Sequence, residues 1–273
     1  MRPRRGLAIA AAAAVGAATA ALFLASRGKW SDAIVDSGIE WAYADALARG
    51  EVLYRDVVYW FGPFTPHFQA AFFRVFGSSF RSLAIAGVAA SLGILAALWA
   101  CLRRVASSRD AWLGTALAIP ALLFMPNSGG AIIGMGYRIW HPAAFTLLAI
   151  ALSSAPEGRS PAWRAALAGA SAGLAGLSRA EWGLMAVAGV VTAFLLARRP
   201  RPGRAATAAA MALLVFAAGV GVAVLRAGWD AVLGDGHVLL LGVSPETRRF
   251  LVSYSGIRRW PQGLAELVYS AAL

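Results

Sequence analysis

About seven long apolar runs, separated by short stretches rich in arginine, dominate this sequence of 273 residues. An apolar run of about 20 residues is long enough to cross the hydrocarbon core of a bilayer as an α-helix. In lipid a helix satisfies all its backbone hydrogen bonds internally, so such runs are expected to be helical. The runs cover residues 6–25, 82–102, 111–125, 139–154, 165–177, 182–197 and 205–225. The sequence therefore predicts an all-α, polytopic transmembrane helix bundle of about seven spans.

The composition excludes a soluble globular protein. Hydrophobic residues make up 59% of the chain and charged residues only 14%, whereas soluble domains are about 25% charged. A soluble fold of this size would have to expose large apolar patches. The net charge of +12 raises the possibility of a nucleic-acid partner. The charges, however, punctuate the apolar runs and form no basic face, so we expect no nucleic acid.

The arginines alternate between the two ends of the predicted spans. Cytoplasmic loops carry an excess of Lys and Arg, which places the N-terminus in the cytoplasm. The cytoplasmic stretches would then hold Arg2, Arg4, Arg5, Arg103, Arg104, Arg109, Arg159, Arg164, Arg198, Arg199, Arg201 and Arg204. The short external loops hold only Arg138 and Arg179. We expect an integral membrane protein of the bacterial inner (plasma) membrane.

The chain is expected to form a single membrane domain over residues 1–273. Its parts are a first span at 6–25, an external loop at 27–81, a span bundle at 82–226 and an external C-terminal segment at 227–273. The first run exceeds the ~7–15 residues usual for the apolar part of a signal peptide, which favours a membrane anchor over that alternative. The sequence ends inside an apolar stretch, so we expect an N-terminal fragment of a longer protein.

The predicted first external loop is acidic and carries two short helices. It holds Asp32, Asp36, Glu40, Asp45, Glu51 and Asp56, six of the 13 acidic residues. Residues 37–40 fit a capping box with Ser37 as the cap, and Gly50 suits a C-terminal cap. These signals predict an amphipathic helix over residues 38–49, lying on the membrane surface.

A second juxtamembrane amphipathic helix is predicted after the first. Thr65 followed by Pro66 fits an N-cap and the proline favoured at the first helical position. Four phenylalanines follow, and Gly77 would end the helix. At about 13 residues this segment is too short to span a bilayer.

Three stretches of this loop resemble a known family of membrane enzymes. They are DSGIEWAY at residues 36–43, ALARGEVLYRD at 46–56 and YWFGP at 59–63. Together they resemble the first loop of GT-C superfamily glycosyltransferases, nearest to the protein-mannosyltransferase-like and lipopolysaccharide-core-like enzymes that use polyprenyl-phosphate sugars. Many relatives have an acidic pair where this chain has Asp36 and Ser37, and many are longer, with an external C-terminal domain.

The resemblance implies transfer of a sugar from a polyprenyl-phosphate-linked donor to an acceptor hydroxyl on the outer face. Asp36 would be the catalytic base, since a carboxylate near hydrocarbon has a raised pKa. Arginine forks match phosphate oxygens, so Arg138 and Arg179 would bind the donor phosphate. The full set of expected substrate-binding residues is Glu40, Asp56, Arg138, His141, Arg179 and Glu181. The partners implied are the lipid-linked sugar and membrane lipid; protein partners are left open. No cofactor is implied beyond a divalent cation, whose ligands are unknown.

Each of these residues also has a structural interpretation. Asp36 suits a helix cap, Asp56 a loop charge, and the two external arginines lipid headgroups. Glu181 is placed to neutralise Arg179. His67, His141 and His237 lack the neighbouring ligands that a metal site needs.

A transporter or a non-catalytic membrane subunit is the alternative function. Transporters often consist of two matching halves, and the sequence shows no such repeat. The sequence also contains no phosphate-binding loop and no hydrolase or zinc-protease motif. The residues therefore favour the glycosyltransferase interpretation.

Overall fold

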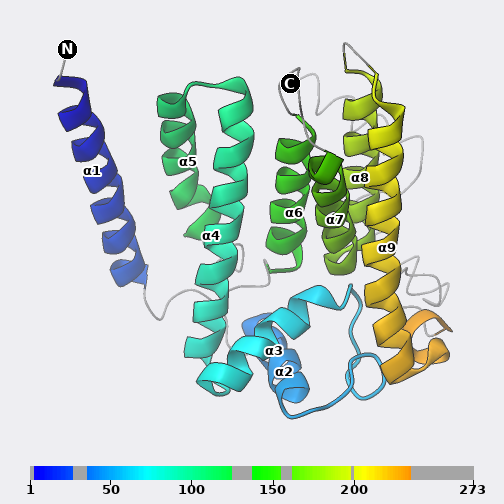
Figure 1. The fold of residues 1–273 in the computed structure, drawn as a ribbon. Helices are drawn as coiled ribbons and strands as arrows, with labels where there is room; N and C mark the ends of the chain where they lie inside the picture. Colours follow the sequence, from blue (N-terminus) through cyan, green and yellow to red (C-terminus); the bar gives the residue numbers. More distant parts are fainter. Residues whose placement is uncertain (1–2, 27–35, 125–136, 155–161, 198–199, 235–273) are drawn as a thin grey trace, which may run out of the picture.

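A computed structural model describes residues 3–26, 36–124, 137–154, 162–197 and 200–234 of the chain (Figure 1). Within these ranges the protein is all-helical, and its only β-type pairing is an isolated bridge between Leu53 and Val57. The helices are α1 (Pro3–Ser26), α2 (Asp36–Ala48), α3 (Phe64–Phe76), α4 (Phe80–Val105), α5 (Ser108–Leu123), α6 (Tyr137–Ser153), α7 (Ala162–Ser178), α8 (Ala180–Leu195) and α9 (Pro202–Ala227), followed by the π-helical turn η1 (Asp230–Gly234).

Each of the seven apolar runs of the sequence forms a helix. Among the described residues, α4 and α9 are long and apolar enough to cross a membrane, with 26 residues each and therefore a length of about 39 Å. Shorter apolar helices are formed by residues 13–26, 139–153 and 180–195. The all-helical fold is thus confirmed, whereas the number of seven spans is not. The protein is an integral membrane protein.

The ends of the two long helices follow from local sequence. Ser79 caps α4 by accepting a hydrogen bond from the backbone N–H of Ser82 at 3.1 Å, which satisfies one of the free donors of the first turn. Pro202 opens α9, where its missing N–H costs nothing. Gly228 ends α9 with a φ of 92°, a conformation that glycine adopts without strain.

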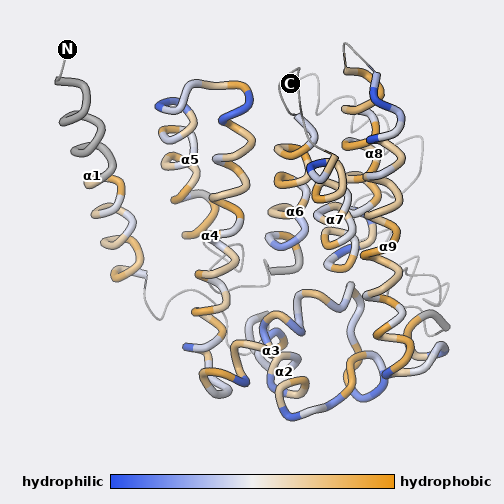
Figure 2. Tube along the Cα trace, in the orientation of Figure 1, coloured by the Kyte–Doolittle hydropathy of each residue, from blue (hydrophilic) through white to orange (hydrophobic). Residues whose placement is uncertain are grey.

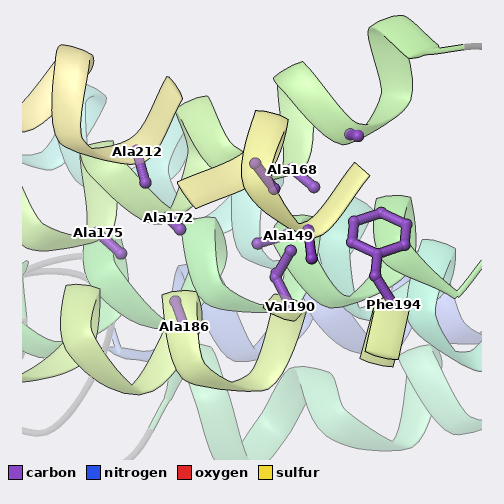
Figure 3. Packing of buried hydrophobic residues seen from close by; sticks show 11 residues of the cluster. Ala149, Ala168, Ala172, Ala175, Ala186, Val190, Phe194 and Ala212 are labelled. Carbon is purple, nitrogen blue, oxygen red and sulfur yellow. The ribbon is translucent and has the colours of Figure 1, made fainter. Parts of the chain in front are cut away.

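Helix α7 lies at the centre of the bundle and packs against α6, α8 and α9 (Figures 1 and 3). The buried core here consists almost entirely of alanines, together with Val190 and Phe194. A Cβ on Gly169 would overlap the backbone of Ala208 in α9. Small residues of this kind let two helix backbones approach closely, which is how helices associate in lipid.

Helices α2 and α3 form a layer across one end of the bundle (Figure 1). This surface layer packs its two helices on each other and places α3 against α4, α6 and α7. Both helices lie where the sequence predicts them, and Gly50 and Gly77 follow them with φ values of 102° and 81°. The expected surface helices are therefore present.

Two predicted helix caps are wrong. Helix α2 already begins at Asp36, and the buried hydroxyl of Ser37 accepts no hydrogen bond among the described residues. Helix α3 begins at Phe64, with Pro63 as its capping residue and no side-chain cap. Thr65 therefore lies inside the helix, where its hydroxyl is free to make a tertiary contact.

Charged residues gather at the two ends of the bundle and leave its middle apolar (Figure 2). The arginines at the end of α4 and the start of α9 lie at the end opposite the surface layer (Figure 1). This arrangement matches the alternation expected from the sequence. The orientation in the membrane, with the N-terminus in the cytoplasm, stays a prediction.

Candidate functional site

The loop between α2 and α3 is fixed to the bundle at the turn between α7 and α8. The backbone N–H of Gly62 donates a hydrogen bond to the carbonyl of Ser178 at 3.2 Å. A Cβ at position 62 would overlap the carbonyl of Leu177, so only glycine allows this approach. Within the loop, the Tyr54 hydroxyl donates to the Phe61 carbonyl at 2.6 Å. These contacts hold the surface layer directly over the ends of the bundle helices.

A hydrogen bond between side chains joins α3 to α6. Thr65 Oγ1 lies 3.1 Å from Nδ1 of His141, and both residues are buried. The rings of Phe64 and Phe68 meet the imidazole edge-on, with centroids at 5.4 and 4.8 Å. His141 thus joins the two elements, and its expected role in substrate binding stays a prediction.

Arg179 lies at the turn between α7 and α8 and is held on two sides. Its guanidinium forms an ion pair with Glu181, with Nη2 2.5 Å from Oε1. The guanidinium carbon lies 4.8 Å from the centroid of the Phe61 ring, a cation–π contact. The side chain keeps 26% of its surface exposed. Arg179 is therefore fixed in position while part of its side chain remains accessible.

Two carboxylates of α2 are one helical turn apart. Glu40 is fully buried, as is Ser37 one turn before it. Asp36 is the first residue of the helix, and its side chain lies outside the described part of the structure. The interior side of α2 therefore carries a carboxylate, which the prediction of a simple amphipathic helix did not foresee.

Arg138 is the second residue of α6 and precedes His141 by nearly one turn. Its side chain also lies outside the described residues. Because His141 contacts α3, the start of α6 lies at the same end of the bundle as the surface layer. The backbone thus places Arg138, Arg179 and α2 at the same end of the bundle. The expected approach of the two guanidinium groups to each other, around a cavity shared with Asp36, stays a prediction.

Asp56 lies apart from these residues, in the loop between α2 and α3. It accepts two hydrogen bonds of 2.9 Å from Arg55 and one of 2.8 Å from the backbone N–H of Val52. The Arg55 hydrogen bonds, aided by the Val52 donor, lower the pKa of Asp56 to about 2. This carboxylate stabilises its own turn, and its expected role in substrate binding stays a prediction.

Two further polar residues were missed by the sequence interpretation. Thr65 was read as a cap, because a Thr-Pro pair predicts a helix start regardless of tertiary contacts. Gln69 is fully buried in α3, and neither amide atom has a hydrogen-bond partner among the described residues. The sequence did offer a signal for the burial of Gln69, because a residue four positions after Thr65 lies on the same face of the helix. In the described ranges no three His, Cys, Asp or Glu side chains form a group that could hold a metal ion.

The described structure is thus a bundle of apolar helices covered at one end by a fixed layer of surface helices, with Arg179 held beneath that layer. The sequence pattern of the dolichyl-phosphate-mannose-protein mannosyltransferase family matches residues 61–225. The chain belongs to this family, and its class is that of the membrane glycosyltransferases of the GT-C type. The match begins at Phe61, which contacts Arg179, and ends in the last turns of α9. No curated protein and no solved structure matches the chain.

Proposed function

We propose that this protein transfers a sugar from a polyprenyl-phosphate-linked donor to an acceptor hydroxyl on the outer face of the membrane. The family to which it belongs is described as using mannose carried by dolichyl phosphate, which supports a lipid-linked donor. The arginines at the end opposite the surface layer support a cytoplasmic location for that end. The surface layer would then face the periplasm of a bacterial inner membrane.

The reaction needs a base and a phosphate-binding group. The acceptor oxygen forms a bond to the anomeric carbon, and the bond from that carbon to the donor phosphate breaks. The acceptor proton passes to a carboxylate, for which we propose Asp36, and polyprenyl phosphate leaves with the negative charge. Arg138 and Arg179 would stabilise that charge, since arginine pairs with phosphate through two parallel hydrogen bonds.

The position of Arg179 is the observation that carries this proposal. Its guanidinium is held by Glu181 and Phe61 at the end of two bundle helices, directly beneath the surface layer. A guanidinium that is already fixed in position needs little reorganisation when negative charge develops on the leaving phosphate. Glu40, buried in the layer above, supports a polar interior on the side where an acceptor would enter.

An in vitro transfer assay tests the proposed activity. Membranes containing the full-length protein would receive a panel of radiolabelled polyprenyl-phosphate sugars and an envelope extract as acceptor. We expect one donor to give a labelled product together with an equal amount of free polyprenyl phosphate. Hydrolysis of every donor without a glycosylated product, or no turnover of any donor, would contradict the proposal.

Cysteine labelling tests the proposed face. Ser78 and Ser107 are both exposed, and they lie just before and just after α4, at opposite ends of that helix. In a chain carrying Cys101→Ser, Ser78→Cys should react with a membrane-impermeant reagent in intact cells, whereas Ser107→Cys should react only after permeabilisation. The reverse pattern would place the surface layer in the cytoplasm. Ser37, which is buried, is unsuitable for this experiment.

A further inference from the structure

A pocket of about 330 Å³ lies between the end of α2, the middle of α3 and the end of α9. Its lining includes Gly50, Glu51, His67, Arg74 and Arg226. The 13 residues of α2 extend about 20 Å, and the pocket lies at the opposite end of that helix from Asp36. It is therefore distinct from the proposed catalytic end of the surface layer.

The pocket has an excess of positive charge. Arg74 and Arg226 line it from two different helices, and both act on His67: burial chiefly, and then the charges of the two arginines, lower the pKa of this imidazole, which lies outside the spans. Arg74 is fixed by a hydrogen bond of 2.7 Å from Nη2 to the carbonyl of Leu47. The guanidinium of Arg226 makes no ion pair or hydrogen bond with the described residues.

The carboxylate in the pocket lining balances only part of this charge. Glu51 lines the pocket and also pairs with Arg49, with Nη2 3.3 Å from Oε1. The two guanidinium groups therefore outnumber the one carboxylate among the described residues that line the cavity. Arginine forks of this kind match the oxygens of a phosphate group.

The position of the pocket along α9 indicates what carries the phosphate. Arg226 lies in the last turn of this 26-residue apolar helix, and the exposed Trp229 follows it. Tryptophan at the end of a span is typical of the headgroup region. On the neighbouring α3, Val75 and Phe76 are 73% and 56% exposed, as expected for a helix whose apolar side enters the membrane surface. The pocket thus lies at the depth of lipid phosphates.

We propose that His67, Arg74 and Arg226 bind the phosphate group of an anionic membrane lipid. The two arginines bind the phosphate oxygens. The imidazole lies beside them with its Nδ1 donating to the Pro63 carbonyl, so its Nε2 becomes a further donor to the phosphate when the ring is protonated. This inference does not rest on the proposed glycosyl transfer, because the pocket uses none of the residues assigned to that reaction. Occupancy would fix the end of α9 to α3 and to the loop after α2.

Thermal unfolding of the full-length protein in a neutral detergent tests the site. A ligand that binds only the folded protein raises its Tm in a saturable way. We expect short-chain phosphatidic acid to do so and short-chain phosphatidylcholine to have no such effect at the same concentration. Inorganic phosphate forms the third arm, because it distinguishes a free anion from a lipid headgroup.

Three variants show whether the effect belongs to this pocket. Arg226→Gln removes an exposed side chain without a partner in the described structure, and it should weaken the phosphatidic acid effect by about 10-fold or more, the loss typical of a charge-assisted hydrogen bond. Arg74→Gln should weaken it similarly. Arg81→Gln, which alters an exposed arginine in the first turn of α4, should leave it unchanged.

The remaining outcomes overturn the assignment. A wild-type Tm that does not respond to phosphatidic acid, or an equal response in Arg226→Gln, removes the site. An equal loss in Arg81→Gln shows general attraction to a basic surface. Saturation by inorganic phosphate at lower concentration than by the lipid shows that a soluble phosphate, and not a lipid, is the ligand.

Discussion

Thr65 Oγ1 in α3 lies 3.1 Å from Nδ1 of His141 in α6, and this hydrogen bond fixes the surface layer to the bundle. The bond forms nearly one turn from Arg138, for which we propose a role in binding the donor phosphate. Both groups are buried, so neither has water as a substitute partner. The relative position of the layer and the bundle helices therefore depends on a specific polar contact as well as on apolar packing.

Thr65→Val should destabilise the protein, because it leaves the buried Nδ1 of His141 without its hydroxyl partner while preserving side-chain volume. A buried polar group that loses its partner costs about 1–3 kcal/mol. The expected result is a lower Tm in detergent. Thr207→Val is the matched control: Thr207 is exposed, and its hydroxyl donates to the Gly203 carbonyl within its own helix. Equal stability changes in the two variants would show that the tertiary bond contributes nothing.

Gly62→Ala should separate the loop from the end of α7. The added Cβ would overlap the Leu177 carbonyl, so the loop must move and its hydrogen bond to Ser178 must lengthen. Overpacking of this kind costs about 1–3 kcal/mol. Limited proteolysis of the 50–63 loop should accelerate. Gly93→Ala is the control, because the new Cβ there meets open space. A helical Gly→Ala change is neutral or stabilising. A loop equally resistant in both variants would contradict this account.

The stability of the protein should fall as the pH falls through the titration of His67. Burial, followed by the charges of Arg226 and Arg74, lowers the pKa of this imidazole from its ordinary 6.5, although a hydrogen bond to the Pro63 carbonyl opposes the shift. A depressed pKa means that the unfolded chain binds the proton more readily. The contribution of the neutral His67 to the stability of the folded protein is therefore present above about pH 6.5 and is lost as the pH falls below it.

The His67 variant provides the measurement. In phosphate-free buffer, unfolding of the wild type and of His67→Gln would be followed between about pH 8 and 5, the range in which an ordinary histidine titrates. The wild type should lose more stability than the variant across this range. Parallel curves would show that His67 has the same pKa in the folded and unfolded states.

The helices of this fold could be predicted from the sequence because their signals are local. An apolar run, a Pro at its start or a Gly at its end acts within a few residues, and α4, α9 and both surface helices lie where those signals place them. The cap at Thr65 failed because its competing partner is distant in sequence: Thr65 bonds to His141, 76 positions away. Nothing in a local pattern reveals that choice.

The site was predictable only in part for the same reason. The arginine at the start of α8 was identified from its external position, and its pairing with Glu181 follows from their spacing. Its contact with Phe61 could not be predicted, because Phe61 lies before α3 and Arg179 lies after α7, far apart in the sequence. The burial of Glu40 was also missed, because polar residues are assigned to the solvated face of a surface helix, whereas Glu40 is fully buried here.

Arg179→Lys should impair transfer while preserving the charge. Lysine lacks the planar fork that pairs with Glu181 and with phosphate at the same time, so the substitution is not conservative at such a site. Losing one charge-assisted hydrogen bond costs about 1.5–3 kcal/mol, which corresponds to roughly a 10- to 100-fold lower kcat/KM. Arg81→Lys is the control at an exposed position of α4. An unchanged kcat/KM for Arg179→Lys would show that this residue only neutralises Glu181.

Asp36→Asn should abolish most of the transfer activity if Asp36 is the base. General-base catalysis contributes about 10²–10⁴-fold, and the amide is nearly the same size as the carboxylate, so membrane expression and Tm should remain near those of the wild type. Asp230→Asn is the matched control, since Asp230 is exposed beyond the end of α9. Full activity in Asp36→Asn, or a loss explained by misfolding, would reject the assignment. Glu40, one turn further along α2 and fully buried, would then be the carboxylate to test by Glu40→Gln, ahead of Asp56, whose partners Arg55 and Val52 already occupy its oxygens.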